Sequence, residues 1–163
     1  MSYKLLLPIL LMGNLCFAQH QFELKDASKN YDVKINVENC ENNECSGKAT
    51  IELFDKKTSK KFQTLSSDDL NFYLNEDQKP TANIIQLYNE QSPLIFDDFN
   101  FDGTEDVAIR NGNESGYGGP SYDVYVFNIT KKQLVPSEEL TQLAHENLGM
   151  FNTDSERKRL ITY

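Results

Sequence analysis

The chain has 163 residues, and its 25 acidic and 16 basic side chains give a formal net charge of −9 at pH 7. A surface this acidic repels nucleic acid and anionic lipid, so those two classes of partner are excluded. The length fits a single domain with one sizeable core. An acidic protein can be steered onto a basic partner, and many cell-wall hydrolases are basic, although solubility alone also explains such a charge.

Residues 1–18 have the features of a secretory signal peptide. Lys4 supplies a positive charge, residues 5–15 are mostly apolar, and Cys16 and Ala18 are the small residues that a signal peptidase reads. The apolar run is shorter than the roughly 20 residues that span a bilayer. Cleavage after Ala18 would leave residues 19–163, with 15 basic and 25 acidic groups, as a single β-rich domain. We therefore expect an exported, periplasmic protein with no membrane attachment once the signal is removed.

Two cysteines remain in the predicted mature chain, Cys40 and Cys45. In an oxidising compartment this spacing indicates a disulfide across a tight hairpin. A metal site would need two further soft ligands nearby, and the spacing differs from the C-x-x-C of redox enzymes.

Alternation of apolar and polar residues predicts β-strands along most of the chain. Residues 31–38 and 49–53 form the first expected hairpin around the cysteines. Further strands are expected at 62–65, 70–74, 84–88, 94–96, 106–110 and 122–128. The fold class is therefore mainly β, either an antiparallel β-sandwich or a propeller-blade-like sheet, with one short helix near the C-terminus.

That helix is expected to begin after Ser137 and to end at Gly149, with Leu140, Leu143 and Ala144 on its apolar face. A final hairpin is expected from residues 150–152 and 159–163, with its turn at 153–156. The sequence stops inside this last strand. Either Tyr163 ends an edge strand or the domain is truncated there.

Residues 98–106 read D-x-N-x-D-G-x-x-D and predict a calcium loop. The side chains of Asp98, Asn100 and Asp102, the backbone carbonyl of Thr104 and the carboxylate of Asp106 are the expected ligands. An EF-hand is excluded because its twelfth position falls on Ile109, where a bidentate glutamate is required. The loop instead resembles those of integrin-type FG-GAP propellers, although it occurs once here. The alternative is an Asx-rich turn that holds no metal.

A glycine-rich loop at residues 111–122 follows and contains four of the eight glycines. Tyrosine and serine beside glycine provide large amphipathic anchors and adaptable hydrogen bonds, which suit insertion into a polar cleft. The expected partner-binding residues are Ser115, Gly116, Tyr117, Gly118, Gly119, Ser121 and Tyr122. The alternative is a solvated loop that only connects two strands. No Gly-Lys-Ser/Thr or helix start accompanies it, so nucleotide binding is not indicated.

Residues 98–113 together with 117–125 resemble the calcium-binding periplasmic immunity proteins that neutralise lysozyme-like effectors of bacterial type IV secretion systems. Those proteins are similar in fold to the periplasmic inhibitors of invertebrate-type lysozyme. The resemblance implies that a loop with a Ser-Gly-x-x-Tyr type motif enters the active-site cleft of the hydrolase. Residues 115–117 and 119–122 are the candidate matches, and they leave open which tyrosine is the anchor. Members of that family continue beyond the end of this chain, which favours the truncation hypothesis.

An enzymatic function has little support in the sequence. Neither His20 nor His145 has an evident nucleophile or metal-ligand partner, and Asp97 and Asp98 point to opposite faces of a strand. We therefore expect a calcium-stabilised inhibitor of a peptidoglycan hydrolase, with no catalysis of its own. The alternative is a calcium-dependent carbohydrate- or adhesion-binding module.

Overall fold

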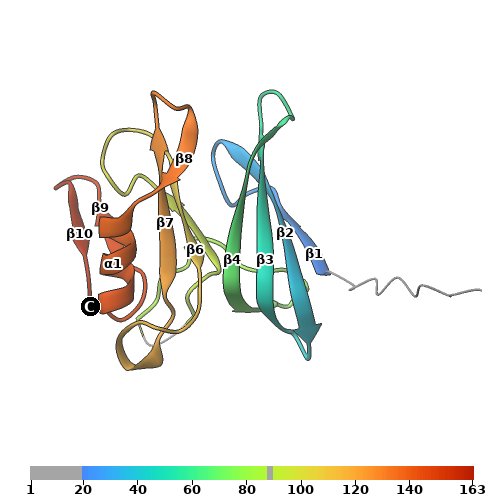
Figure 1. Cartoon of the computed structure of the whole chain (residues 1–163). Coiled ribbons are helices and arrows are strands. Elements are labelled where there is room, and N and C mark those ends of the chain that lie inside the picture. Colours follow the sequence, from blue (N-terminus) through green and yellow to red (C-terminus); the bar gives the residue numbers. More distant parts are fainter. Residues whose placement is uncertain (1–19, 88–89) are drawn as a thin grey trace, which may run out of the picture.

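The computed structural model describes residues 20–87 and 90–163, so the predicted signal peptide lies outside the described residues. The fold is mainly β, as predicted, with three antiparallel sheets and one short helix near the C-terminus (Figure 1). Two four-stranded sheets pack face to face as a sandwich. The helix and a two-stranded sheet lie over the outer face of the second sheet.

The first sheet consists of four consecutive antiparallel strands. They are β1 (His20–Leu24), β2 (Tyr31–Glu41), β3 (Glu44–Asp55) and β4 (Lys61–Tyr73). Val33, Ile35 and Val37 of β2 are buried because alternate side chains of a strand point to one face. Pairing of β2 with β3 confirms the predicted first hairpin.

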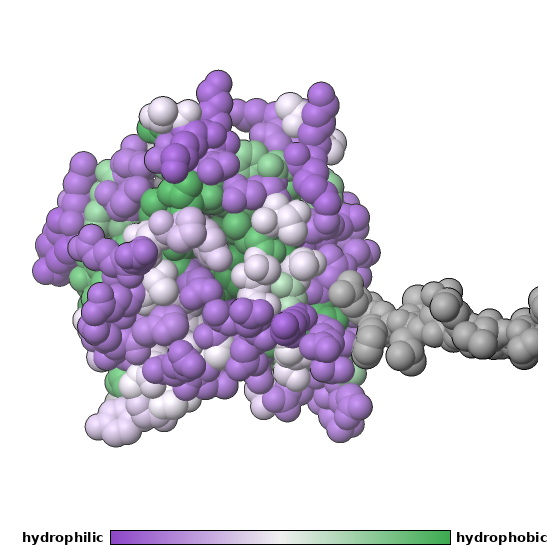
Figure 2. Space-filling model, viewed as in Figure 1, coloured by the Kyte–Doolittle hydropathy of each residue, from purple (hydrophilic) through white to green (hydrophobic). Residues whose placement is uncertain are grey.

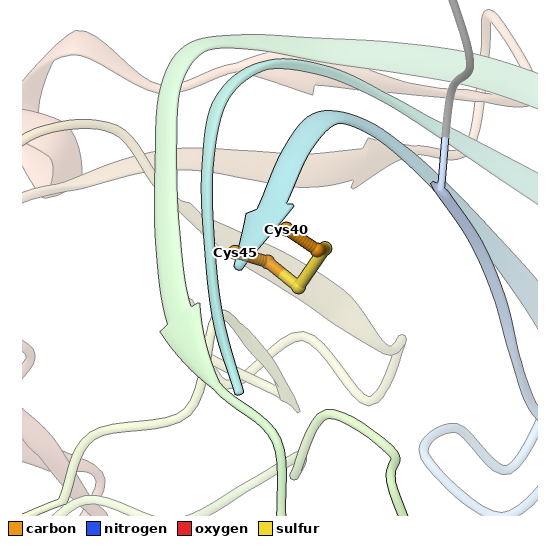
Figure 3. The surroundings of a disulfide bond; sticks show 2 residues. All are labelled: Cys40 and Cys45. Carbon is orange, nitrogen blue, oxygen red and sulfur yellow. A yellow bond between two sulfur atoms is a disulfide. The ribbon is translucent and has the colours of Figure 1, made fainter. Parts of the chain in front are cut away.

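The predicted disulfide is present and closes the β2–β3 hairpin (Figure 3). Cys40 and Cys45 lie directly opposite each other, with their Cα atoms 4.0 Å apart. At the tip, Asn42 and Asn43 have φ angles of 52° and 67°. A two-residue turn of this type requires positive φ at both positions, which asparagine tolerates well.

Strand β4 corrects one prediction. Residues 62–65 and 70–74 are predicted as two short strands, but one strand runs through the polar residues between them. Ser67 in the middle is buried, and its hydroxyl donates a hydrogen bond to the carbonyl oxygen of Arg110 at 2.8 Å. Burial of a serine costs little folding free energy when its hydroxyl is hydrogen-bonded, so the polar stretch does not interrupt the strand.

The second sheet is buried on both faces. It consists of β5 (Leu94–Asp97), β6 (Asp106–Arg110), β7 (Tyr122–Asn128) and β8 (Gln133–Pro136). Val107 and Ile109 lie in the core shared with the first sheet, whereas Ala108 lies in a second core beneath the helix. Burial on both sides explains the uninterrupted apolar runs at 94–96 and 107–109.

Helix α1 (Glu138–Glu146) follows its predicted N-cap, Ser137, whose hydroxyl accepts a hydrogen bond from the backbone N–H of Leu140. The helix ends at Glu146, before the predicted Gly149, so that prediction is wrong by about one turn. The final hairpin consists of β9 (Asn152–Asp154) and β10 (Arg159–Ile161), and its turn falls two residues later than predicted.

Three other elements differ from the predictions. Strands β1 and β8 were not expected. The predicted strand at 84–88 is not formed in its described part, where Ile85 makes only an isolated bridge to Gln91.

The surface in view in Figure 2 is mostly hydrophilic, with apolar side chains visible mainly towards its middle. Within residues 20–87 and 90–163, no helix is long and apolar enough to span a membrane.

Candidate functional site

Residues 98–106 form a turn whose side-chain oxygens point back at the loop backbone. Asp98 accepts hydrogen bonds from the N–H groups of Asp102 and Gly103, at 3.0 and 2.8 Å. Asn100 accepts from the same Asp102 N–H at 3.0 Å. Asp102 accepts from the N–H and the hydroxyl of Thr104, at 2.8 and 2.5 Å, and that hydroxyl holds the pKa of Asp102 below its usual value. The loop is thus closed into a ring, and Gly103 has the φ of 88° that the bend requires.

Asp106, the last residue of the loop, is fully buried. One carboxylate oxygen accepts from the N–H of Phe99 at 2.9 Å and the other from the N–H of Phe127 at 2.8 Å. Burial raises the pKa of Asp106 to about 6, against the lowering effect of these two backbone donors. The carboxylates of Asp98 and Asp102 raise it further.

The donor set of this loop fits a hard cation such as calcium. Carboxylate, amide and backbone carbonyl oxygens are the ligands calcium prefers, and residues 98–106 supply all three kinds. The carboxylates of Asp98 and Asp102 disfavour the negative charge of Asp106, a repulsion that a cation would offset. In the described part of the chain, no three His, Cys, Asp or Glu side chains form a ready metal cluster. Binding here would therefore depend on Asn100 and the Thr104 carbonyl as well as on the carboxylates.

Glu105, inside the same loop, joins it to the first sheet. Its carboxylate accepts from the hydroxyl of Ser28 at 2.6 Å, from the N–H of Lys29 at 2.9 Å and from the side chain of Asn30 at 3.1 Å. These residues lie in the connection between β1 and β2. The loop consequently holds the two sheets together at one end of the sandwich.

The glycine-rich loop is compact and ends in one exposed aromatic side chain. Its tip is a single 3₁₀ turn, η1 (Gly116–Gly118). Tyr117 has a φ of 57° and its side chain is 100% exposed. A non-glycine residue held at positive φ with a fully exposed aromatic ring is uncommon and marks a candidate contact site.

Three of the predicted partner-binding residues are buried in this structure. Tyr122 is 0% exposed, and its hydroxyl donates to the carbonyl oxygen of Ser92 at 2.8 Å. Ser121 and Ser115 are also buried. The Ser121 hydroxyl donates to the carbonyl oxygen of Asn111 at 2.6 Å and so shapes the loop from inside. The remaining predicted residues, Gly116, Tyr117, Gly118 and Gly119, form the tip.

Contacts from two directions hold the base of this loop. The N–H of Gly112 donates to the carbonyl oxygen of Asp69 in β4 at 2.7 Å, and the N–H of Gly116 donates to that of Asn147 after α1, also at 2.7 Å. A Cβ atom at position 116 would lie 3.1 Å from that Asn147 oxygen, so glycine permits the close approach. The loop is therefore preorganised by the first sheet and by the end of the helix.

The structure separates the two loops that the sequence places side by side. The calcium loop and the glycine-rich loop of residues 111–122, called the tyrosine loop below, lie at opposite ends of β6, next to Asp106 and Arg110 respectively. The calcium loop therefore does not hold the base of the tyrosine loop. The guanidinium of Arg110 donates to the Asn113 side chain at 2.6 Å, within the tyrosine loop.

Three acidic residues lie in or beside the tyrosine loop, a feature that the sequence did not reveal. Glu114 lies within the loop and its side chain is 80% exposed. Asp69 of β4 pairs with the base of the loop, and the Asp123 carboxylate accepts from the Asn111 side chain at 2.8 Å. His145 of α1 also comes close, its ring nitrogens lying 4.0 Å from the Glu114 carboxylate and 3.8 Å from that of Asp123. These residues are far apart in sequence, so only the folded sheets bring them together.

No protein-family model matches the chain, and no curated protein matches it. A solved structure described as a Xanthomonas type IV secretion system related protein is similar, with a TM-score of 0.56. The similarity covers 83% of this chain and 69% of that chain, at 20% sequence identity. Similarity at this level of identity shows a shared fold.

Proposed function

We propose that this protein is an exported immunity protein that inhibits a lysozyme-like peptidoglycan hydrolase and has no catalysis of its own. The observation that carries the proposal is the Tyr117 side chain, fully exposed at the tip of a loop fixed at its base. A rigid aromatic side chain loses little conformational entropy on binding, so it suits the centre of an inhibitory contact. The fold shared with a type IV secretion system related protein agrees with this proposal.

The charge around the loop supports a basic target. Glu114 lies exposed in the loop and Asp69 lies at its base, and the whole chain carries a net charge of −9. Complementary charge speeds association and orients two partners more than it strengthens the final complex. The target we propose is therefore a hydrolase with a basic rim around its substrate cleft, with Tyr117 inserted between the rim residues.

Calcium has a structural role in this proposal. Asp98, Asn100, Asp102, Thr104 and Asp106 would hold the ion, as the sequence predicts, at the end of β6 away from Tyr117. A cation there would neutralise the acidic loop and stabilise its junction with residues 28–30. The ion would thus stabilise the sandwich and make no contact with the hydrolase.

Inhibition assays with purified lysozyme-like effectors of type IV secretion systems test the proposal. We expect wild-type protein at equimolar amounts to stop cell-wall lysis, and Tyr117→Ala to restore it. Ile129→Ala is the matched control, because Ile129 is an exposed apolar residue at the opposite end of β7. Undiminished lysis with excess wild-type protein, across all cognate effectors, would reject the proposal. Calcium-dependent binding on a glycan array would then favour the carbohydrate-binding alternative.

A further inference from the structure

Three of the four outer strands of the two main sheets have their free edges covered. At β8, the N–H and carbonyl of Leu134 both bond to the side-chain amide of Gln63, each at 2.9 Å. At β5, the carbonyl oxygen of Leu94 accepts from the N–H of Asn83 at 3.0 Å, and the N–H of Phe96 donates to the Asn83 side chain at 2.7 Å. Side chains and loop backbone thus replace a neighbouring strand, a common protection for sheet edges.

The edge of β4 is covered in the same way. The Ser67 hydroxyl and the carbonyl of Asp69 bond to Arg110 and Gly112 of the second sheet and its loop, at 2.8 and 2.7 Å. The N–H of Asp69 donates to the Asn111 side chain at 3.0 Å.

Strand β1 is different. In the part of the chain that the structure describes, β2 alone hydrogen-bonds to its backbone, so the outward N–H and C=O groups of β1 have no protein partner. A groove of about 860 Å³ runs beside this edge, between β1 with the residues after it and the segment 78–83. An uncovered strand edge beside a groove is a template for one more strand.

We propose that β1 pairs with β1 of a second copy of this chain, forming one continuous eight-stranded sheet across a twofold axis. The charges that line the groove favour a copy of itself as the occupant. Glu23 and Asp26 are balanced there by Lys25 and Lys79, in a protein that is acidic overall. A strongly charged partner gains little at a balanced surface, whereas a second copy meets this surface without net charge repulsion.

The sequence of β1 selects one register. Phe22 and Leu24 pack against the core, while Gln21 and Glu23 face solvent. Residues that lie directly opposite each other in an antiparallel pair point to the same face of the sheet. The apolar faces of the two copies therefore coincide only if one residue of β1 lies on the axis, opposite its own copy. An axis at Glu23 would place two glutamates opposite each other, and an axis at Gln21 would leave Glu23 and Leu24 unpaired. An axis at Phe22 uses the whole strand and places Gln21 opposite Glu23 and His20 opposite Leu24.

This dimer leaves the tyrosine loop free. Figure 1 shows β1 at the outer edge of the first sheet, while the second sheet, which carries the loop, lies on the other side of the sandwich. Both copies would therefore present Tyr117 at the same time, and the dimer stands whether or not the inhibitory function is correct.

Sedimentation equilibrium of the purified protein tests the dimer and its register. Two variants introduce opposite charges at Gln21. Gln21→Glu places like charges across the axis twice, so we expect the dimer dissociation constant to rise roughly tenfold. Gln21→Lys places lysine opposite Glu23 twice and should lower the constant. Gln133→Glu and Gln133→Lys are the matched controls, because Gln133 is exposed on β8, away from β1.

Amide hydrogen exchange supplies a second measurement. The outward amides of β1 should become protected as protein concentration rises, and urea unfolding at low concentration should show that both Gln21 variants remain folded. A monomer at every concentration overturns the proposal. So does a dimer whose dissociation constant responds equally to the Gln21 and Gln133 changes, because its interface would then lie elsewhere.

Discussion

Tyr117 and Tyr122 belong to the same loop and occupy opposite environments. The Tyr117 side chain is fully exposed, whereas the Tyr122 hydroxyl donates to the Ser92 carbonyl oxygen at 2.8 Å inside the protein. The two tyrosines should therefore respond differently to substitution.

Tyr117→Ala should weaken inhibition by about 2 kcal/mol or more if this ring is the central anchor. Stability should stay within about 0.5 kcal/mol of wild type, because the side chain packs against nothing. Tyr122→Phe should show the reverse pattern, losing about 1 kcal/mol of stability with the buried hydrogen bond while inhibition is retained. Inhibition titrations and urea unfolding measure the two effects. Equal loss of inhibition in both variants would mean that the loop acts through its fold and that Tyr117 is not an anchor.

Glu105→Ala should destabilise the protein by about 1–3 kcal/mol, because it leaves the buried Ser28 hydroxyl without an acceptor and also removes the hydrogen bonds from residues 29 and 30. The affected groups are the Ser28 hydroxyl and the backbone of residues 29–30, which hold the first sheet against the loop. Urea unfolding gives the free energy, with Glu156→Ala as the exposed control. If both variants unfold at the same denaturant concentration, the junction between residues 28–30 and Glu105 adds nothing to stability.

Tyr31 should ionise only in strongly alkaline solution. Burial raises its pKa to about 12, and the carboxylates of Glu105 and Asp55 add to the effect. Because the folded-state pKa is raised, the related stability is complete below pH 10, the usual tyrosine range, and is lost as pH rises through about 12. In an ultraviolet titration, Tyr31→Phe should reduce the number of late-ionising tyrosines by one, because burial also raises the pKa values of Tyr122 and Tyr125. Glu105→Gln should lower the pKa of Tyr31. An unchanged titration in this variant would mean that Glu105 does not influence the ionisation of Tyr31.

Chelation should lower the melting temperature. A cation that binds only the folded state stabilises it by mass action, by about 2.7 kcal/mol at a hundred times its dissociation constant. Calorimetry with calcium and then with excess chelator measures the change. Asp98→Asn keeps the size of the side chain but removes a charged ligand, so this variant should respond less to calcium than wild type does. Identical melting curves with and without chelator, in wild type, would favour the metal-free turn.

The sequence predicted local features of the fold well. Alternation located β2 and β3, the cysteine spacing predicted the disulfide, and Ser137 marked the start of the helix. Each of these signals depends on residues close together in the chain. The two additional strands, β1 and β8, are defined by pairing with a neighbour, which no local pattern reveals.

The candidate site was predicted in part, for the same reason. Glycine and tyrosine content located the loop, but the sequence pattern could not show that Tyr117 is exposed and Tyr122 is buried. Tyr122 begins β7 and points inward, whereas Tyr117 sits at a turn. The position of Asp69 from β4 and the contact with Asn147 depend on how distant segments pack, so they required the folded structure.

The shared core between the two sheets has a consequence for the order of folding. Each sheet is built from one unbroken stretch of chain, so its strands can pair as soon as they are made. Neither can bury its apolar face alone, because Ile35 and Ile51 of the first pack with Val107 and Ile109 of the second. When the chain emerges from its N-terminus, the apolar face of the first sheet therefore stays exposed until about residue 136 has emerged, at the end of β8. We therefore expect the final folding of the chain to be a late event, which agrees with the export that we propose for this protein.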